Sequence, residues 1–103
     1  MLVDESNYSD AHGTPYVYQT LGIGEIVGAP VPGTMTAVWW ERQIDPTITF
    51  GIPEVTSLDR NGKALENQQL QPDVEVYNTP EQVLSGVDNQ LITATKRVMK
   101  KIK

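Results

Sequence analysis

Prolines and glycines interrupt this chain at short intervals, and their spacing limits the fold more than any other feature of the sequence. Seven prolines and eight glycines are distributed over 103 residues. Both residue types disfavour helix interiors, and between residues 22 and 86 they mark the turns that separate short segments. Only residues 10–21 and 88–102 suit longer helices. The segments between them favour short strands joined by tight turns.

The expected order of elements is β-α-β-β-β-β-α. This is a mixed α/β fold with a small mixed sheet and a mostly antiparallel second half. A single domain over residues 1–103 is expected, because the chain is long enough for one modest core. The Asn61-Gly62 pair predicts a tight hairpin turn. The expected strands are residues 2–3, 25–29, 36–44, 47–53 with a continuation over 55–58, and 74–76.

The first helix is expected over residues 10–21, with Ser9 or Asp10 as its cap and Gly22 at its end. Pro15 should kink this helix or delay its start, since proline lacks the N–H that a helix requires. The residues expected on its inner face are Tyr16, Val17, Thr20 and Leu21.

A second helical region is expected near the C-terminus. Thr79 and Pro80 are typical of a helix start, and Asp88 caps a last, amphipathic helix. Its apolar positions, which should face the core, are Leu91, Ala94, Thr95, Val98 and Ile102. In the preceding strand region, Trp39 and Trp40 should point to opposite faces, one into the core and one towards an interface. The alternative for one of them is a place in a substrate groove.

Composition excludes several classes of protein. The chain has no cysteine, so it has neither a disulfide framework nor a thiolate zinc site, although this does not identify a compartment. No apolar stretch is long enough to span a membrane. The net charge is −5, yet residues 96–103 hold five of the eight basic side chains. Cations in the last turn of a helix offset its dipole, so nucleic-acid binding is not expected.

The segment DESNYSDAHGTP, residues 4–15, places Ser9 between a strand and a helix. A serine at such a turn exposes its hydroxyl, and the first N–H groups of the helix lack intrahelical partners. Those donors suit the oxyanion of an acyl-transfer intermediate. The alternative is that Ser9 is only a helix cap. Ser6 is a weaker candidate nucleophile because it lies back towards the strand.

Three separated motifs resemble the C-terminal processing (tail-specific) serine peptidases and their tricorn-protease relatives. The first is VDESNYSDAHGTPYVYQTLGIGEIVGAPVPGT, which is similar to the catalytic segment of that family. LENQQLQPDVEV and PEQVLSGVDNQL resemble two later stretches, in the same order. The resemblance covers nearly the whole chain and implies the C-terminal part of a serine peptidase catalytic domain.

This resemblance implies catalytic roles for particular residues. Ser9 falls on the family nucleophile, the backbone N–H of Asp10 falls on the oxyanion donor, and Glu66 falls on the glutamate of the tricorn branch. Without the resemblance, Glu66 reads as an ordinary solvated carboxylate. Thr34 stands where the tail-specific branch has its lysine base, so a Ser-Lys dyad is not expected.

In the tricorn branch the base is a histidine upstream of the nucleophile, and this chain has no counterpart to it. The only histidine, His12, is three residues after Ser9 and is expected to lie at the surface or at an interface rather than to act as the base. Asn67 is expected to hold the Glu66 loop through its side chain. Tyr16 and Tyr18 are expected to pack.

The resemblance therefore implies a serine endopeptidase acting on peptide or protein substrates through an acyl-enzyme on Ser9. It implies no metal or organic cofactor. The missing N-terminal half of the catalytic domain is the expected partner, and the 103 residues alone are expected to be inactive. The alternative is a non-catalytic interaction module that dimerises through an open sheet edge.

Overall fold

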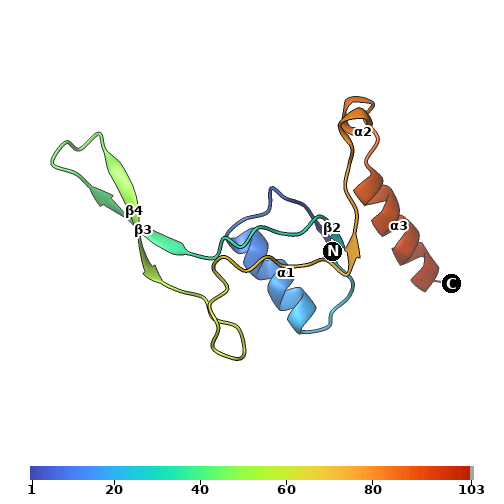
Figure 1. Cartoon of the computed structure of the whole chain (residues 1–103), viewed down its shortest axis with the longest axis horizontal. Helices are drawn as coiled ribbons and strands as arrows, with labels where there is room; N and C mark the ends of the chain where they lie inside the picture. The colour runs from blue at the N-terminus through green and yellow to red at the C-terminus, as the bar shows by residue number, and fades with distance from the viewer. Residues whose placement is uncertain (103) are drawn as a thin grey trace.

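The computed structural model describes residues 1–102 as a small body with an extended hairpin on one side and a helix on the other (Figure 1). The elements in chain order are β1 (Leu2–Val3), α1 (Asp10–Thr20), β2 (Val27–Gly28), β3 (Ala37–Arg42), β4 (Thr49–Val55), β5 (Val74–Glu75), α2 (Pro80–Leu84) and α3 (Asn89–Lys101).

The strands form two separate sheets instead of one small mixed sheet. A three-stranded sheet has the order β1-β2-β5, and both of its strand pairs are parallel. Parallel neighbours need a crossover between them, and α1 provides it between β1 and β2. The other sheet is the antiparallel β3–β4 hairpin. The antiparallel pairing expected of the second half is therefore found in this hairpin, whereas β5 joins the parallel sheet.

The core lies where α1 covers the parallel sheet. Its main cluster contains Val3, Ile26, Val31 and Leu70, against which Tyr16 and Tyr18 pack as expected. Gly28 permits the tight pairing of β1 with β2, because it adopts φ 141° and a Cβ there would lie 1.7 Å from the Val3 carbonyl oxygen. No other residue type would fit at this position without moving β1.

The helix α1 begins at Asp10 in spite of Pro15, so the expected delay is wrong. Pro15 has no N–H to donate to the carbonyl of Ala11, one turn earlier. The Asn7 side-chain amide takes its place, with Nδ2 donating to the Ala11 carbonyl oxygen over 3.0 Å. Gly22 follows the helix with φ 64°, as expected.

The buried face of α1 also differs from the expected one. His12 and Pro15 are its buried residues. Val17 and Leu21, which were expected on the inner face, are 51% and 61% exposed. Hydrophobicity alone misplaces the face because α1 contacts the loop at residues 63–70, through His12 and Tyr16, as well as the sheet.

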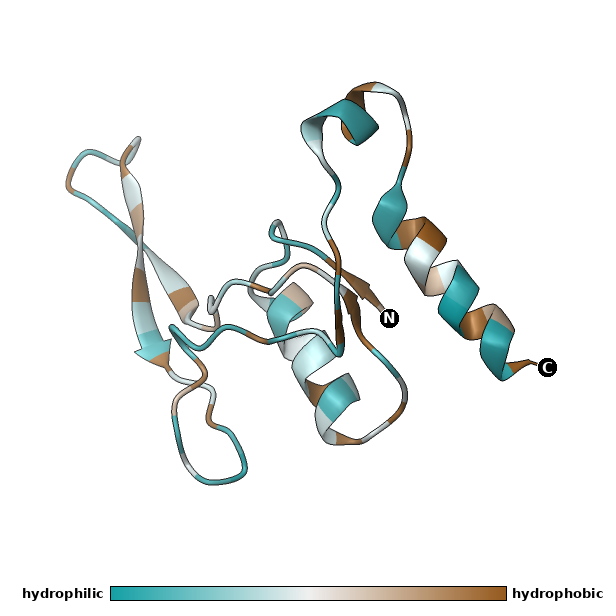
Figure 2. Cartoon of the chain, turned by 45° about the vertical axis from the view of Figure 1, so that its right-hand side comes forward, coloured by the Kyte–Doolittle hydropathy of each residue, from teal (hydrophilic) through white to brown (hydrophobic). Residues whose placement is uncertain are grey.

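The β3–β4 hairpin projects from the body (Figure 1), and hydrophobic segments alternate with paler and hydrophilic ones along it (Figure 2). Trp39 and Trp40 alternate as expected, but they are 47% and 72% exposed, so neither belongs to the core. Beyond the hairpin, Asp59 accepts hydrogen bonds from the N–H groups of Asn61 and Lys63 and closes the expected tight turn.

The two C-terminal helices begin as expected. In α2, the Thr79 and Gln82 side chains each bond to the other's backbone N–H, forming a capping box with Pro80 in the first turn. In α3, the Asp88 side chain accepts from the Leu91 N–H.

The face that α3 turns towards the sheet is more polar than expected. The half-buried residues in α3 include Gln90, Thr93, Ala94 and Arg97, whose spacing of three and four places them on one face of the helix. Of the residues expected on the inner face, Leu91, Val98 and Ile102 are each at least half exposed.

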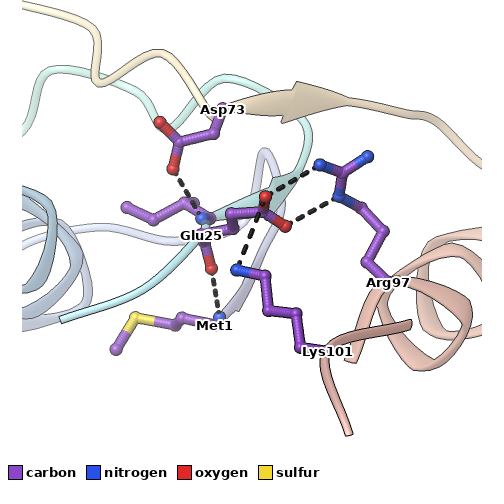
Figure 3. A network of polar contacts seen from close by, with 6 residues as sticks. Met1, Glu25, Asp73, Arg97 and Lys101 are labelled. Atoms are coloured by element: carbon purple, nitrogen blue, oxygen red, sulfur yellow. Dashed lines mark hydrogen bonds and ion pairs between the residues drawn. The ribbon is translucent and has the colours of Figure 1, made fainter. Parts of the chain in front are cut away.

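Ion pairs attach α3 to the start of β2 (Figure 3). The Arg97 guanidinium donates two hydrogen bonds to the Glu25 carboxylate at 2.7 and 2.8 Å, and lowers the pKa of Glu25 to about 2. Lys101 approaches the same carboxylate at 3.5 Å. On the other side of the strand start, Asp73 accepts from the Ile26 N–H. Polar contacts thus replace the apolar docking that the sequence predicts.

In the described part of the chain, no helix combines the length and apolar character needed to cross a bilayer.

Candidate active site

Ser9 has an unusual backbone conformation immediately before α1. Its φ is 53° and its ψ is −120°, a region that non-glycine residues rarely occupy. The Ser9 side chain makes no capping hydrogen bond to the first turn. The residue is half-buried. Its geometry is therefore that of a sharp strand-to-helix turn whose hydroxyl is not used as a cap.

Backbone hydrogen bonds on both sides hold Ser9 in this conformation. Its N–H donates to the Thr34 carbonyl oxygen over 2.9 Å, and its own carbonyl oxygen accepts from the N–H groups of His12 and Gly13 at 2.8 and 3.0 Å. A strained residue persists where its surroundings fix it in this way. Thr34 thus serves the turn through its carbonyl group.

Asp10 is the first residue of α1. Its N–H consequently has no acceptor within the helix and lies at the positive end of the helix dipole. The Asp10 side chain is exposed, so the backbone rather than the carboxylate is the group that the fold fixes at this point.

Ser9 and Glu66 form hydrogen bonds to neighbouring residues, Thr34 and Met35. Whereas Ser9 bonds to Thr34, the Glu66 Oε2 accepts from the N–H of Met35 over 2.6 Å. A hydrogen bond from the Thr36 side chain, together with the Met35 bond, lowers the pKa of Glu66 below its usual value. The carboxylate is therefore ionised and held beside the Ser9 turn, although 57 residues separate the two in sequence.

The segment around Glu66 packs closely on residues 33–36. The Asn67 N–H donates to the Gly33 carbonyl oxygen over 2.6 Å, with Asn67 at φ 61°. A Cβ at Gly33 would lie 2.4 Å from the Gln68 nitrogen. The loop is thus held by the Asn67 backbone and by its close approach to Gly33. The Asn67 side chain was expected to hold it.

His12 is not at the surface, contrary to the sequence-based expectation. It is 1% exposed, and it is the buried polar residue of the described core. Burial lowers the pKa of His12, and the charge of Glu66 acts in the opposite direction. The expectation was wrong because one histidine within a helix gives no periodic signal of burial.

Ser6 is exposed and its hydroxyl donates to the Asp4 carboxylate. Met35 and Thr36, the partners of Glu66, are site residues that sequence reasoning missed. They lie about 30 residues from Glu66, and no spacing rule connects them. Within residues 1–102, histidine and acidic side chains do not gather into a group of three that could hold a metal ion.

Comparisons with known proteins agree with one another. The tricorn protease of Thermoplasma acidophilum is 25% identical over 103 residues, covering 99% of this chain and 10% of that protein. The crystal structure of the tricorn protease matches with a TM-score of 0.86 at 24% identity, over 97% of this chain and 10% of that one. The crystal structure of mature CPAF matches with a TM-score of 0.70 at 21% identity, over 80% and 16% of the two chains.

These structural matches show that the fold is shared, including the mixed α/β arrangement predicted from the sequence. The chain spans about a tenth of the length of the tricorn protease. The sequence model of peptidase family S41 matches residues 1–76, which is more than half of the chain. On this ground the chain belongs to peptidase family S41.

Proposed function

We propose that this chain is the part of a serine endopeptidase that supplies the nucleophile Ser9 and the supporting carboxylate Glu66. The observation that carries the proposal is the strained Ser9 turn, whose hydroxyl is not used as a cap. The Ser9 N–H donates to the Thr34 carbonyl oxygen, and the N–H of the next residue, Met35, donates to Glu66. Such a turn is typical of an exposed serine nucleophile. Membership of a peptidase family supports the same assignment.

In this proposal Ser9 Oγ attacks the carbonyl carbon of a peptide bond, and the N–H of Asp10 stabilises the resulting oxyanion. The Asp10 N–H suits this role because no helical acceptor competes for it. The serine proton must pass to a base, and the leaving amine must receive it. Glu66, ionised beside residues 34–36, orients that base and stabilises its charged form.

The base itself comes from outside these 103 residues. His12 is a poor candidate, because it is buried and its side chain faces the loop at residues 63–70. We therefore infer that the N-terminal half of the catalytic domain contributes a histidine, the second oxyanion donor and the other wall of the substrate groove. The chain alone should be nearly inactive, since loss of the base lowers the rate by orders of magnitude.

The test is hydrolysis of an unstructured peptide by the longer protein that carries this segment. Replacing Ser9 by alanine should reduce kcat/KM at least about a thousandfold while the circular dichroism spectrum stays unchanged. Ser6→Ala is the matched control, three residues away, and should keep its activity. Comparable activity in the Ser9→Ala protein would overturn the assignment, as would full activity of residues 1–103 alone.

A second function is a non-catalytic interaction module. The observation in its favour is that β1 lies at the edge of the sheet and pairs on one side with β2. An edge of this kind can add a strand from another chain. A fluorophosphonate probe combined with size-exclusion chromatography separates the two functions. Labelling at Ser9 in the longer protein supports the peptidase, whereas a dimer that remains unlabelled supports the module.

A further inference from the structure

The buried imidazole of His12 is a polar group whose role the peptidase proposal does not explain. His12 is the only histidine of the chain and is 1% exposed. Its Nδ1 atom is enclosed and has no hydrogen-bond partner among the described residues. Buried polar atoms are nearly always satisfied, so an exception of this kind calls for a reason.

The ring lies between α1 and the segment that carries Glu66. His12 and Tyr16 of α1 form one wall of a cavity of about 190 Å³, and residues between Asp59 and Leu70 form the opposite wall. Leu65 and Gln68, on either side of the Glu66-Asn67 pair, are among the lining residues. The ring therefore lies on the same cavity as the loop that carries Glu66.

The backbone of His12 reaches the other half of the site. Its N–H donates to the Ser9 carbonyl oxygen over 2.8 Å. Next to it, a Cβ at Gly13 would be 3.4 Å from the terminal methyl of Met35, the residue whose N–H holds Glu66. His12 thus lies at the junction of the Ser9 turn, residues 33–36 and the Glu66 loop.

We propose that His12 is a proton-sensitive positioning residue, whose uncharged ring keeps the Ser9 turn and the Glu66 loop in their positions relative to each other. Its importance for catalysis rests on the proposed function, but its structural effect does not. Protonation would place an N–H at Nδ1, where no described residue offers an acceptor, and a charge on a ring that is 1% exposed. Either change pushes α1 and the Glu66 loop apart.

The charges around the ring determine the direction of the effect. Asp59, Lys63 and Tyr16 line the same cavity, and Glu66 is the charged group that acts on His12. Burial, the larger influence, lowers the pKa of His12 below 6.5. The unfolded chain therefore binds more protons than the folded chain between 6.5 and the folded pKa, and stability falls as the pH is lowered through that window.

The first experiment is an NMR titration of the ¹⁵N-labelled chain. A single histidine gives a single set of imidazole signals, and their midpoint should lie below 6.5. The amide resonances of Ser9 and Met35 should shift with the same midpoint, while those of the β3–β4 hairpin should not. A midpoint at or above 6.5, or Ser9 and Met35 resonances that do not follow the ring, would overturn the proposal.

A pair of carboxylate variants tests the contact with the Glu66 loop. Removing the negative charge in Glu66→Gln should lower the His12 midpoint further, because that charge favours the protonated ring. Asp45→Asn is the matched control at the turn of the hairpin, and it should leave the midpoint unchanged. Equal midpoints in the Glu66→Gln and unmodified chains would show that the ring and the carboxylate are not coupled.

The variant His12→Gln removes the titrating group. The Ser9 and Met35 resonances should then lose their pH dependence, and the chain should stay folded to lower pH than the unmodified protein. If this variant does not fold, the titration and Glu66→Gln decide the question alone. These measurements need no turnover, so they can be interpreted even if the peptidase assignment fails. Ser9 and Met35 resonances that do not shift with the titration of His12 would refute only the present proposal.

Discussion

Ser9 combines a strained backbone with an available hydroxyl. For a residue with a side chain, the backbone conformation at φ 53° and ψ −120° costs a free energy of order 1–3 kcal/mol relative to an ordinary conformation. The structure retains this strain because hydrogen bonds to Thr34, His12 and Gly13 fix both backbone groups of the residue. Strain of this kind collects at functional sites, and it has a measurable consequence for stability.

At this position glycine should be more stabilising than alanine. Because glycine adopts positive φ without strain, Ser9→Gly should unfold with a free energy about 1 kcal/mol higher than Ser9→Ala in urea. Ser6 has no positive φ, so at that position glycine should be equal to alanine or less stable. If Ser9→Gly is no more stable than Ser9→Ala, as is expected of the glycine and alanine variants at Ser6, the turn is not strained.

Among the elements, α1 shows most clearly how a local conflict is resolved by a neighbouring residue. Pro15 lies within the helix, yet the helix is continuous from Asp10 to Thr20. The Asn7 amide donates to the carbonyl oxygen of Ala11 that proline leaves without its usual partner. The helix therefore depends on a residue that precedes it, next to the Ser9 turn.

A double-mutant cycle should detect this dependence. Asn7→Ala should lower the free energy of unfolding by about 1 kcal/mol in the unmodified chain. In a Pro15→Ala background the cost should be smaller, because alanine supplies an N–H for the Ala11 carbonyl. Ser6→Ala provides the control for a change in the same loop. Equal costs of Asn7→Ala in both backgrounds would contradict the role assigned to Asn7.

As a whole, the molecule is open rather than spherical, with a radius of gyration of 17.4 Å and a longest dimension of 60 Å. The parallel sheet and α1 share the core, while the β3–β4 hairpin projects with nearly all its residues exposed (Figure 1). Isolated two-stranded hairpins are marginally stable in water. The hairpin and the apolar face of α3 are therefore the parts of the chain that most need a partner.

Hydrogen exchange should separate these regions. In the isolated chain at low concentration, β3–β4 amides should exchange at least about tenfold faster than those of Val31 and Leu70, which bond to each other in the core. Because the hairpin amides are already paired within the ribbon, their fast exchange would report opening of the ribbon itself. Slow exchange in a chain shown to be monomeric by sedimentation would contradict this view, and protection that rises with concentration would indicate association.

The sequence by itself determined the features that depend on neighbouring residues. The C-terminal end of α1, the starts of α2 and α3, the turn at Asn61-Gly62 and the position of Ser9 before a helix follow from caps, proline and glycine. The fold class and the family were also predictable, because three motifs in order leave few alternatives. Each of these signals is local, and local backbone preferences act over only a few residues.

Only the tertiary structure decided which surfaces are covered and which distant groups meet. The burial of His12, the exposure of Trp39 and Trp40, and the polar docking of α3 contradict hydrophobic patterns read one element at a time. The bond between Glu66 and Met35 joins segments about 30 residues apart. The physical reason is that burial and long-range hydrogen bonding depend on the packing of all elements together, which the chemistry of a single segment does not contain.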